Sequence, residues 1–586
     1  MRTTPHLVLT CALAAAIDCN VAHAMSLFGS RTDVVEVGVR EVPADDLWQV
    51  SYHLPFRAAG IELPRGRGTF RRDAWSVVPA TSTWVDAGDG ERLCFARPTR
   101  DFAVSFRSDT APRARDHAVN LAMSDGGRLL YTGHLVVRPL ESCAAGPATT
   151  EASDRELVHR FRLSTESGRT VRVLELAAEG ALTWRPPAGK EATYAYFGPQ
   201  APAPGERIGL VADPALPSWL RKDLETSVAT LLDRFAAETA LALPVRPLVL
   251  LSFDGHGSGR GFQGGVVGGV VQLAAVGEGW LTESTEGRRM WTLRLARELF
   301  HLWDEALLHP DGESEWLSEA AAEAFALRAA YGLGVIDARQ LAERLVDLGN
   351  QCLAGLDGGA LISAPDRRRW DTSKGGDTWY TCGPVLLFVA GQAVEKARPG
   401  EGGLGLLARE MLAEAQAAGG VYGTGTFLGW LDKLSGDRAT VLALQGWIRR
   451  GVPRGADRFL AQQLSAAGYR VTLAPPAEAG ASSEVFGTLL GTGLTRCACG
   501  PAGLEASPEV AAPEGDCALL AGGSRPQRVD DVEVRRDPAA AYSRFRTAAG
   551  LGRPLRVVAG DGGQPLTLFC GRDSLDPSFD QLLRLE

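Results

Sequence analysis

The chain has 586 residues, a formal net charge of −9 and 45% apolar residues. This length exceeds one ordinary domain and predicts three or four, while the balance of apolar and charged residues excludes a disordered or fibrous protein. Because 61 basic residues are outnumbered by 70 acidic ones, we expect no nucleic-acid partner and no binding to anionic membranes.

The N-terminus has the pattern of a secretory signal peptide at residues 1–24. Arg2 precedes a short apolar run at residues 7–17, and Ala24 ends a small-x-small cleavage site. The run is too short to cross a bilayer, and no later stretch is apolar enough to do so. The sequence therefore predicts a soluble mature chain without a membrane span, either secreted or periplasmic.

Eight of the ten cysteines remain after the signal peptide is removed, and an even number in an exported chain favours disulfides. Cys497 and Cys499 are too close in sequence to pair comfortably with each other. This leaves two possible connectivities among the four C-terminal cysteines. A zinc-binding cysteine cluster is the rival interpretation of that group, although its C-x-C spacing is a poor zinc knuckle. The three local groups are Cys94 with Cys143, Cys352 with Cys382, and Cys497, Cys499, Cys517 and Cys570.

Short alternating runs separated by Gly, Pro and Asp clusters fill residues 25–200 and predict an all-β domain, a sandwich. The period then becomes helical, and residues 201–465 predict an α+β domain with a helical subdomain. The last region, residues 466–586, predicts a small β-rich domain braced by disulfides. Expected strands are at 34–39, 47–54, 102–106, 129–137, 170–176, 243–253, 262–276, 529–534 and 555–559. Expected helices are at 218–241, 286–304, 315–333, 337–353, 376–397, 403–417, 437–450 and 539–549.

The chemistry-bearing residues lie on two successive expected helices. Glu298 and His301 form a Glu-x-x-His pair on the first helix, and Glu319 is in the phrase Trp-Leu-Ser-Glu on the second. Zinc metallopeptidases place H-E-x-x-H on a helix, so that two His at i and i+4 hold zinc and the Glu activates a water. Here Arg297 stands at the position of the first His.

The phrase Glu-Leu-Phe-His-Leu-Trp at 298–303 resembles the H-E-L-F-H-x-W of the glycyl aminopeptidase family of gluzincin metallopeptidases. The phrase at 316–319 resembles that family's W-L-S-E-G, with Ala320 in place of Gly. Residues 380–383 resemble its Y-x-K-G, with Cys382 in place of Lys. The resemblance implies a thermolysin-like, gluzincin domain at 201–465 and a C-terminal domain that is a diverged PDZ-like module. It also implies that Glu298 is the general base, that Tyr380 stabilises the oxyanion, and that His301 and Glu319 are metal ligands.

Arg297 conflicts with a working zinc site. A guanidinium has no free lone pair and stays protonated, and it repels a dication. We therefore expect a degenerate site without a cofactor, in which Arg297 takes the electrostatic role of the metal and pairs with Glu298, Glu319 or both. Another possibility is a rescued zinc site of His301, Glu305 and Glu319, with Asp304 on the same helix face.

The leading functional hypothesis is an exported pseudopeptidase that binds a peptide or protein in an extended conformation. In metallopeptidases of this type a strand above the catalytic helix pairs with substrate backbone, and the glycine- and valine-rich segment 264–271 lies at the corresponding place in the chain. Two alternatives remain open. One is an active zinc-dependent peptidase or aminopeptidase with a substitute ligand, and the other is a structural interaction module of the cell envelope.

Overall fold

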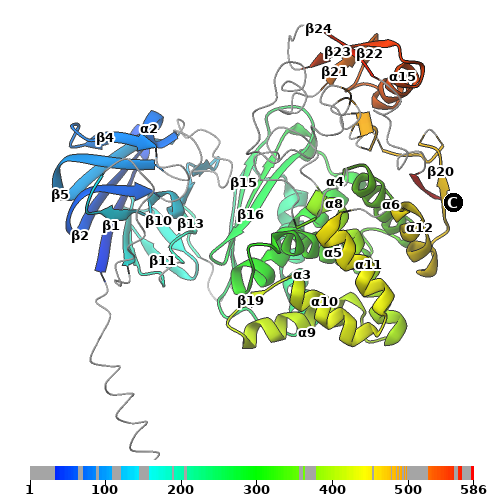
Figure 1. Cartoon of the computed structure of the whole chain (residues 1–586). Coiled ribbons are helices and arrows are strands. Elements are labelled where there is room, and N and C mark those ends of the chain that lie inside the picture. Colours follow the sequence, from blue (N-terminus) through cyan, green and yellow to red (C-terminus); the bar gives the residue numbers. More distant parts are fainter. Residues whose placement is uncertain are drawn as a thin grey trace, which may run out of the picture. The chain divides into compact units, whose positions relative to one another are not determined.

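The computed structural model describes the chain in segments. The described residues are 33–63, 70–86, 91–108, 120–143, 157–187, 190–202, 208–355, 361–362, 378–451, 455–476, 478–482, 485–487, 489–490, 494, 497, 526–559, 565–570 and 582–586. They form two compact units (Figure 1). The first unit takes the described residues of 1–216, 245–254 and 267–274, and the second unit takes the rest. The predicted signal peptide lies outside the described residues. No helix within the described segments is long and apolar enough to cross a membrane.

The first unit is built on two β-sheets with a shared core, as the sequence predicts for its N-terminal part. One sheet has the order β12-β9-β1-β2-β5-β3, with β4 beside β5 and β8 beside β2, and the other has the order β11-β10-β13-β7-β6. Trp48 of the first sheet meets Phe197 of the second edge to face, with ring centroids 4.9 Å apart. Their shared apolar core makes this pair of sheets a sandwich. The strands are β1 (Asp33–Val42), β2 (Leu47–Leu63), β3 (Ser76–Val78), β4 (Thr83–Asp86), β5 (Glu91–Arg107), β6 (Asn120–Ala122), β7 (Arg128–Tyr131), β8 (Arg138–Leu140), β9 (Leu157–Ser164), β10 (Thr170–Val173), β11 (Leu176–Glu179), β12 (Ala181–Trp184) and β13 (Tyr194–Gly198).

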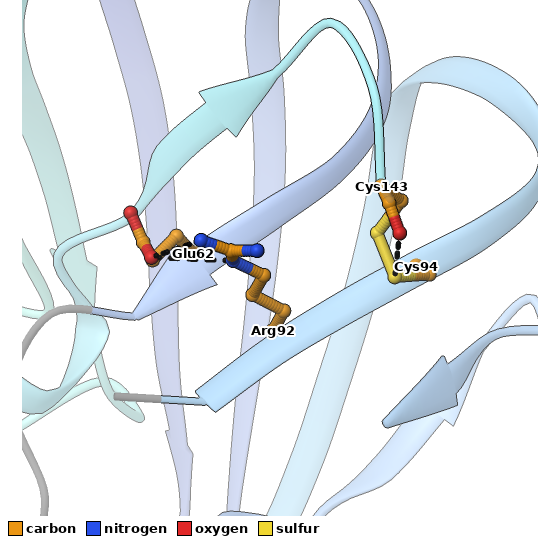
Figure 2. Close-up of a disulfide and its surroundings, with 4 residues drawn as sticks. All are labelled: Glu62, Arg92, Cys94 and Cys143. Carbon is orange, nitrogen blue, oxygen red and sulfur yellow. Dashed lines mark hydrogen bonds and ion pairs between the residues drawn. A yellow bond between two sulfur atoms is a disulfide. The ribbon is translucent and has the colours of Figure 1, made fainter. Parts of the chain in front are cut away.

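A disulfide and an ion pair both involve β5, one of the two long strands of the sandwich. Figure 2 shows Cys94 of β5 bonded to Cys143, which follows β8. On the same strand Arg92 lies 3.2 Å from the Glu62 carboxylate of β2. The pairing of Cys94 with Cys143 confirms the sequence prediction for the first cysteine group.

The first unit also contains strands that come later in the chain. β14 (Gly209–Ala212), β15 (Leu248–Asp254) and β17 (Val270–Val276), whose last two residues belong to the second unit, are neighbours in this order, and β14 runs parallel to β15. The prediction of a single strand at 262–276 was wrong, because β16 (Gly261–Val267) and β17 are separate strands joined by a turn. Gly268 and Gly269 adopt φ values of 56° and 84° there, which glycine reaches without the steric cost paid by other residues.

The second unit is mainly helical, and its central helices lie side by side (Figure 1). The expected helices are all present with shifts of a few residues at their ends. α4 ends earlier than expected, because the chain passes into a π-helical turn at Leu302–Leu307, where the Leu308 N–H donates to the Trp303 carbonyl. Among the longer helices in the described part of this unit, α10 and α12 were not expected. The helices are α3 (Ser218–Thr239), α4 (Thr285–His301), α5 (Glu315–Gly332), α6 (Ala338–Gly355), α8 (Thr378–Ala397), α9 (Leu404–Ala417), α10 (Thr424–Ser435), α11 (Arg438–Arg450), α12 (Ala456–Ala466) and α15 (Pro538–Leu551).

The C-terminal residues add two small sheets to the second unit. One has the order β22-β21-β23-β24, and the other pairs β20 with β25. The side chain of Asn350 on α6 exchanges two hydrogen bonds with the backbone of Leu583 on β25. The PDZ-like character and the predicted domain limits at 200 and 465 stay predictions. The strands are β20 (Val471–Ala474), β21 (Pro526–Val529), β22 (Val532–Glu533), β23 (Pro554–Ala559), β24 (Pro565–Phe569) and β25 (Leu582–Leu585).

Two further disulfides join described residues of the second unit. Cys352 pairs with Cys382, as predicted. Cys497 pairs with Cys570, which selects one of the two connectivities left open for the last group. In that connectivity Cys499 pairs with Cys517, and both lie outside the described residues.

Candidate functional site

Helix α4 carries three of the predicted site residues on consecutive turns. Its first turn is capped by Ser284, whose side chain accepts a hydrogen bond from the backbone N–H of Gly287. Arg297 and His301 are four residues apart and therefore share a face of the helix. Glu298 is buried with 3% of its surface exposed. The helix thus presents the Arg297 guanidinium and the His301 imidazole toward Glu319 of α5, and the Glu298 carboxylate is bound to that guanidinium.

Helix α5 brings Glu319 to this face. Phe300 on α4 stacks on Phe325 on α5, with ring centroids 4.2 Å apart, which fixes how the two helices pack. At the start of α5 the indole N–H of Trp316 donates to the Thr424 hydroxyl. Glu319 then lies against Arg297.

Arg297 joins two carboxylates across the two helices. One terminal guanidinium nitrogen donates to Glu298 Oε1 and the other to Glu319 Oε2. The Tyr380 hydroxyl on α8 donates to the other Glu319 oxygen, at 2.9 Å, and the guanidinium carbon lies 4.9 Å from the Tyr380 ring centroid. We call these four residues the Arg297 network. The pairing of Arg297 with both carboxylates is the arrangement expected from the sequence.

Burial and charge act in opposite directions on the Arg297 network. Burial alone would lower the pKa of Arg297, but the charges of Glu298 and Glu319 outweigh it and raise that pKa. Burial also raises the pKa of Tyr380, and the negative charge of Glu319 raises it further. Arg297 is therefore a permanent cation here, and Tyr380 is a neutral hydrogen-bond donor.

His301 lies among acidic side chains at the end of α4. Its Nδ1 is 3.0 Å from Asp304 and 3.3 Å from Glu305, and its Nε2 is 3.6 Å from Glu319. Burial acts to lower the pKa of His301, but these three carboxylates raise it to about 10. Burial raises the pKa of Asp304 and brings that of Glu305 to about 7. The carboxylates thus favour the imidazolium form of His301, and a metal would have to displace its proton to bind there.

The residues present do not fit a zinc ion. Arg297, at the position of the first His ligand, has no lone pair and carries a positive charge, and Glu319 is already paired with it and lies 3.6 Å from His301 Nε2. Zinc requires deprotonated ligands that converge on one point. The described residues contain no group of three or more His, Cys, Asp or Glu side chains arranged to hold a metal ion.

The rescued ligand set is also not assembled. Glu305 approaches Nδ1 of His301, whereas Glu319 approaches Nε2. The two ring nitrogens point in different directions, so one ion cannot take a ring nitrogen and both carboxylates without rearrangement. The Glu305 carboxylate instead accepts a hydrogen bond from Ser318, at 3.1 Å.

Two partners of the site were not recognised in the sequence. Ser318 binds Glu305, and the Tyr422 hydroxyl donates to the Asp304 carbonyl at 2.8 Å. Ser318 belongs to the Trp-Leu-Ser-Glu phrase and could have been singled out by its position before Glu319. Tyr422 lies 118 residues from its partner, and no local pattern marks it.

Strand β16 lies beside the Arg297 network. A Cβ atom on Gly264 would come within 2.6 Å of Glu298 Cγ, so the strand backbone and the carboxylate side chain are in close contact. Most residues of β16 are exposed or half-buried. The first half of the glycine- and valine-rich segment, residues 264–267, thus lies on an accessible strand beside the predicted catalytic carboxylate, whereas the second half belongs to the turn and to buried β17.

Replacing Gly264 with alanine is expected to lower the free energy of unfolding by about 1–3 kcal/mol, because the new methyl group must displace Glu298. Urea unfolding of both proteins measures this difference. Gly425 in α10 has no atom near its Cβ position, and alanine there should be neutral or stabilising. Equal effects of the two substitutions would contradict the contact with Glu298.

The fold is similar to that of solved metallopeptidase structures. An aminopeptidase N family protein from Idiomarina loihiensis matches with a TM-score of 0.60 and 13% sequence identity, over 94% of this chain and 98% of that chain. A native LTA4 hydrolase from yeast matches at 0.44, with 12% identity over 88% and 85% of the two chains. A two-domain M1 zinc metallopeptidase bound to L-tryptophan matches at 0.40, with 13% identity over 72% and 95%. These two lower scores carry no argument. No protein-family model and no curated protein matches the sequence. The first similarity supports the predicted gluzincin-type fold and says nothing about activity.

Proposed function

We propose that this chain is an exported pseudopeptidase that binds an extended peptide or an unfolded protein segment without cleaving it. The observation that carries the proposal is the Arg297 guanidinium, which is held between Glu298 and Glu319. The fold is similar to that of an aminopeptidase N family protein, and the resemblance makes position 297 the one on which metal-dependent hydrolysis would depend.

The groups that the resemblance assigns to catalysis are paired with one another. Glu298, the expected base, accepts a charge-assisted hydrogen bond from Arg297 on its Oε1 atom. The Tyr380 hydroxyl, the expected oxyanion donor, is bound to Glu319. Neither group is free to act on a substrate carbonyl until the Arg297 network opens.

Binding places fewer demands on the site than cleavage does. β16 is a largely exposed strand, and an extended peptide can add to such a strand through main-chain hydrogen bonds. Arg297 uses two of its five N–H donors for the carboxylates. The polypeptide backbone is therefore the ligand chemistry that this site fits, and we propose that side-chain identity matters little.

An active peptidase is the second candidate, because Glu298, His301, Glu319 and Tyr380 are all retained and gathered at one place. It requires a rearrangement that releases Glu319 from Arg297 and removes the proton from His301. The two candidates therefore differ in a measurable result, cleavage that depends on a divalent metal.

Hydrogen exchange with mass spectrometry tests the proposal, using reduced and carboxymethylated lactalbumin as a permanently unfolded probe. We expect residues 261–267 to gain protection when the probe is added, while the probe stays intact over hours. α10 serves as an internal reference that should not change. Probe cleavage that a metal chelator stops would favour the active peptidase. Unchanged hydrogen exchange in β16 would contradict peptide binding at this strand and would favour the alternative of a structural interaction module.

A further inference from the structure

We infer that the Cys352–Cys382 disulfide positions Tyr380, holding its hydroxyl against Glu319 and so closing the Arg297 network. This inference concerns how the network is held together, and it stands whether or not the chain binds peptides. Cys382 follows Tyr380 by two residues in the first turns of α8, and both cysteines of the bridge are fully buried.

The backbone of α8 cannot hold Tyr380 in the ordinary way. In an α-helix the N–H of residue i+4 donates to the carbonyl of residue i, and the residue four positions after Tyr380 is Pro384. Proline has no N–H, so this helical hydrogen bond cannot form. One of the backbone hydrogen bonds that would hold Tyr380 within α8 is therefore absent, which gives contacts from neighbouring elements a larger share in positioning it.

Two contacts directly after Tyr380 join α8 to its neighbours. The disulfide bonds Cys382 to Cys352 on α6. On the next residue, Gly383 packs against α5 so tightly that a Cβ atom there would lie 2.3 Å from the Ala320 methyl. Ala320 is adjacent to Glu319, so this contact brings the helix that carries Tyr380 next to the carboxylate that Tyr380 binds.

The other end of the bridge is itself fixed. Asn350, two residues before Cys352, makes two hydrogen bonds to Leu583 of β25, at 2.8 and 2.9 Å. A second anchor is non-covalent: the Trp379 indole donates to the Leu361 carbonyl at 3.1 Å. The disulfide is therefore the covalent link between a fixed helix and the turn that carries Tyr380.

The test measures acetylation of tyrosine hydroxyls by N-acetylimidazole, followed residue by residue with mass spectrometry. The variant is Cys352→Ala with Cys382→Val, which removes the link and keeps an apolar pair. We expect Tyr380 to be acetylated roughly tenfold faster than in the native protein. Tyr422, which is buried in the same unit and bonded to Asp304, should not change. As a second measurement, the native protein is first folded and then reduced with a phosphine, and Tyr380 acetylation is followed in the same way. This measurement does not require the variant to fold.

Two further variants make the result specific. Cys94→Ala with Cys143→Ala removes a bridge elsewhere in the chain and should leave Tyr380 protected. Pro384→Ala, added to the disulfide-free variant, restores the missing N–H donor and should lower Tyr380 acetylation again. Unchanged acetylation of Tyr380 in the disulfide-free variant would overturn the inference. An equal rise at Tyr380 and Tyr422 would also overturn it, because the bridge would then act on overall stability alone.

Discussion

Replacing Arg297 with alanine is expected to lower the free energy of unfolding of the second unit by about 3–5 kcal/mol at neutral pH. The reason is that the substitution leaves Glu298, with 3% of its surface exposed, and Glu319 without their shared counter-charge. Removing one partner of a buried ion pair costs more than the pair itself contributes, because the remaining charge stays buried. Thermal or urea unfolding monitored by circular dichroism measures the loss.

A surface arginine on the same helix provides the matched control. Arg289 pairs with Glu286 across one helical turn, and 36% of its side chain is exposed, so its replacement should change stability by no more than about 0.5 kcal/mol. Adding Glu319→Gln to the Arg297→Ala variant should recover part of the loss. An unchanged melting temperature for Arg297→Ala would mean that the ion pairs seen in the structure do not stabilise the fold.

The free energy of unfolding is expected to fall as the pH rises from about 6.5 to about 10. The acidic neighbours raise the pKa of His301 from 6.5 to about 10 in the folded chain, so the folded chain keeps a proton that the unfolded chain releases in this range. The stabilisation is complete below pH 6.5 and is lost as the pH passes through 10. A shift of this size corresponds to at most about 5 kcal/mol. Glu305, whose pKa burial raises to about 7, contributes in the same direction between pH 4.5 and 7.

Urea unfolding at a series of pH values measures this dependence. His301→Gln should flatten the fall between pH 6.5 and 10, since the titrating group is then absent. A slope that persists in the His301→Gln protein would show that other groups cause it.

The helices of the second unit were predictable because long apolar periodicity and local capping residues mark them. α3, α5, α6 and α9 begin within about one residue of the expected positions. α10 escaped recognition because Gly425 and Gly429 weaken its helical pattern. The segment 129–137 was expected to be one strand, but β7 ends at Tyr131 and the chain turns into a buried 3-10 helix at Thr132–Leu135. Apolar residues alone do not distinguish a buried turn from a strand.

The site could be predicted in part because a motif preserves spacing. The metallopeptidase motif identified Glu298 and Glu319 as matches and Arg297 as a departure. Because one cation stands beside two carboxylates, an ion pair between them could be expected from the sequence. The contact of β16 with Glu298 could not be predicted, because it depends on how closely the Gly264 backbone approaches that side chain in the folded chain. The protonation of His301 depends on three carboxylates whose distances the sequence does not contain.

Zinc content is the most direct measure of the central claim, that a guanidinium stands where a metallopeptidase would hold its metal. Elemental mass spectrometry is applied to mature protein exported to an oxidising compartment, beside an Arg297→His variant purified in the same way. We expect substoichiometric zinc in the unmodified protein. The variant should approach one zinc ion per chain, because it restores the missing ligand and removes the competing cation from Glu319. Near-stoichiometric zinc in the unmodified protein would contradict the account.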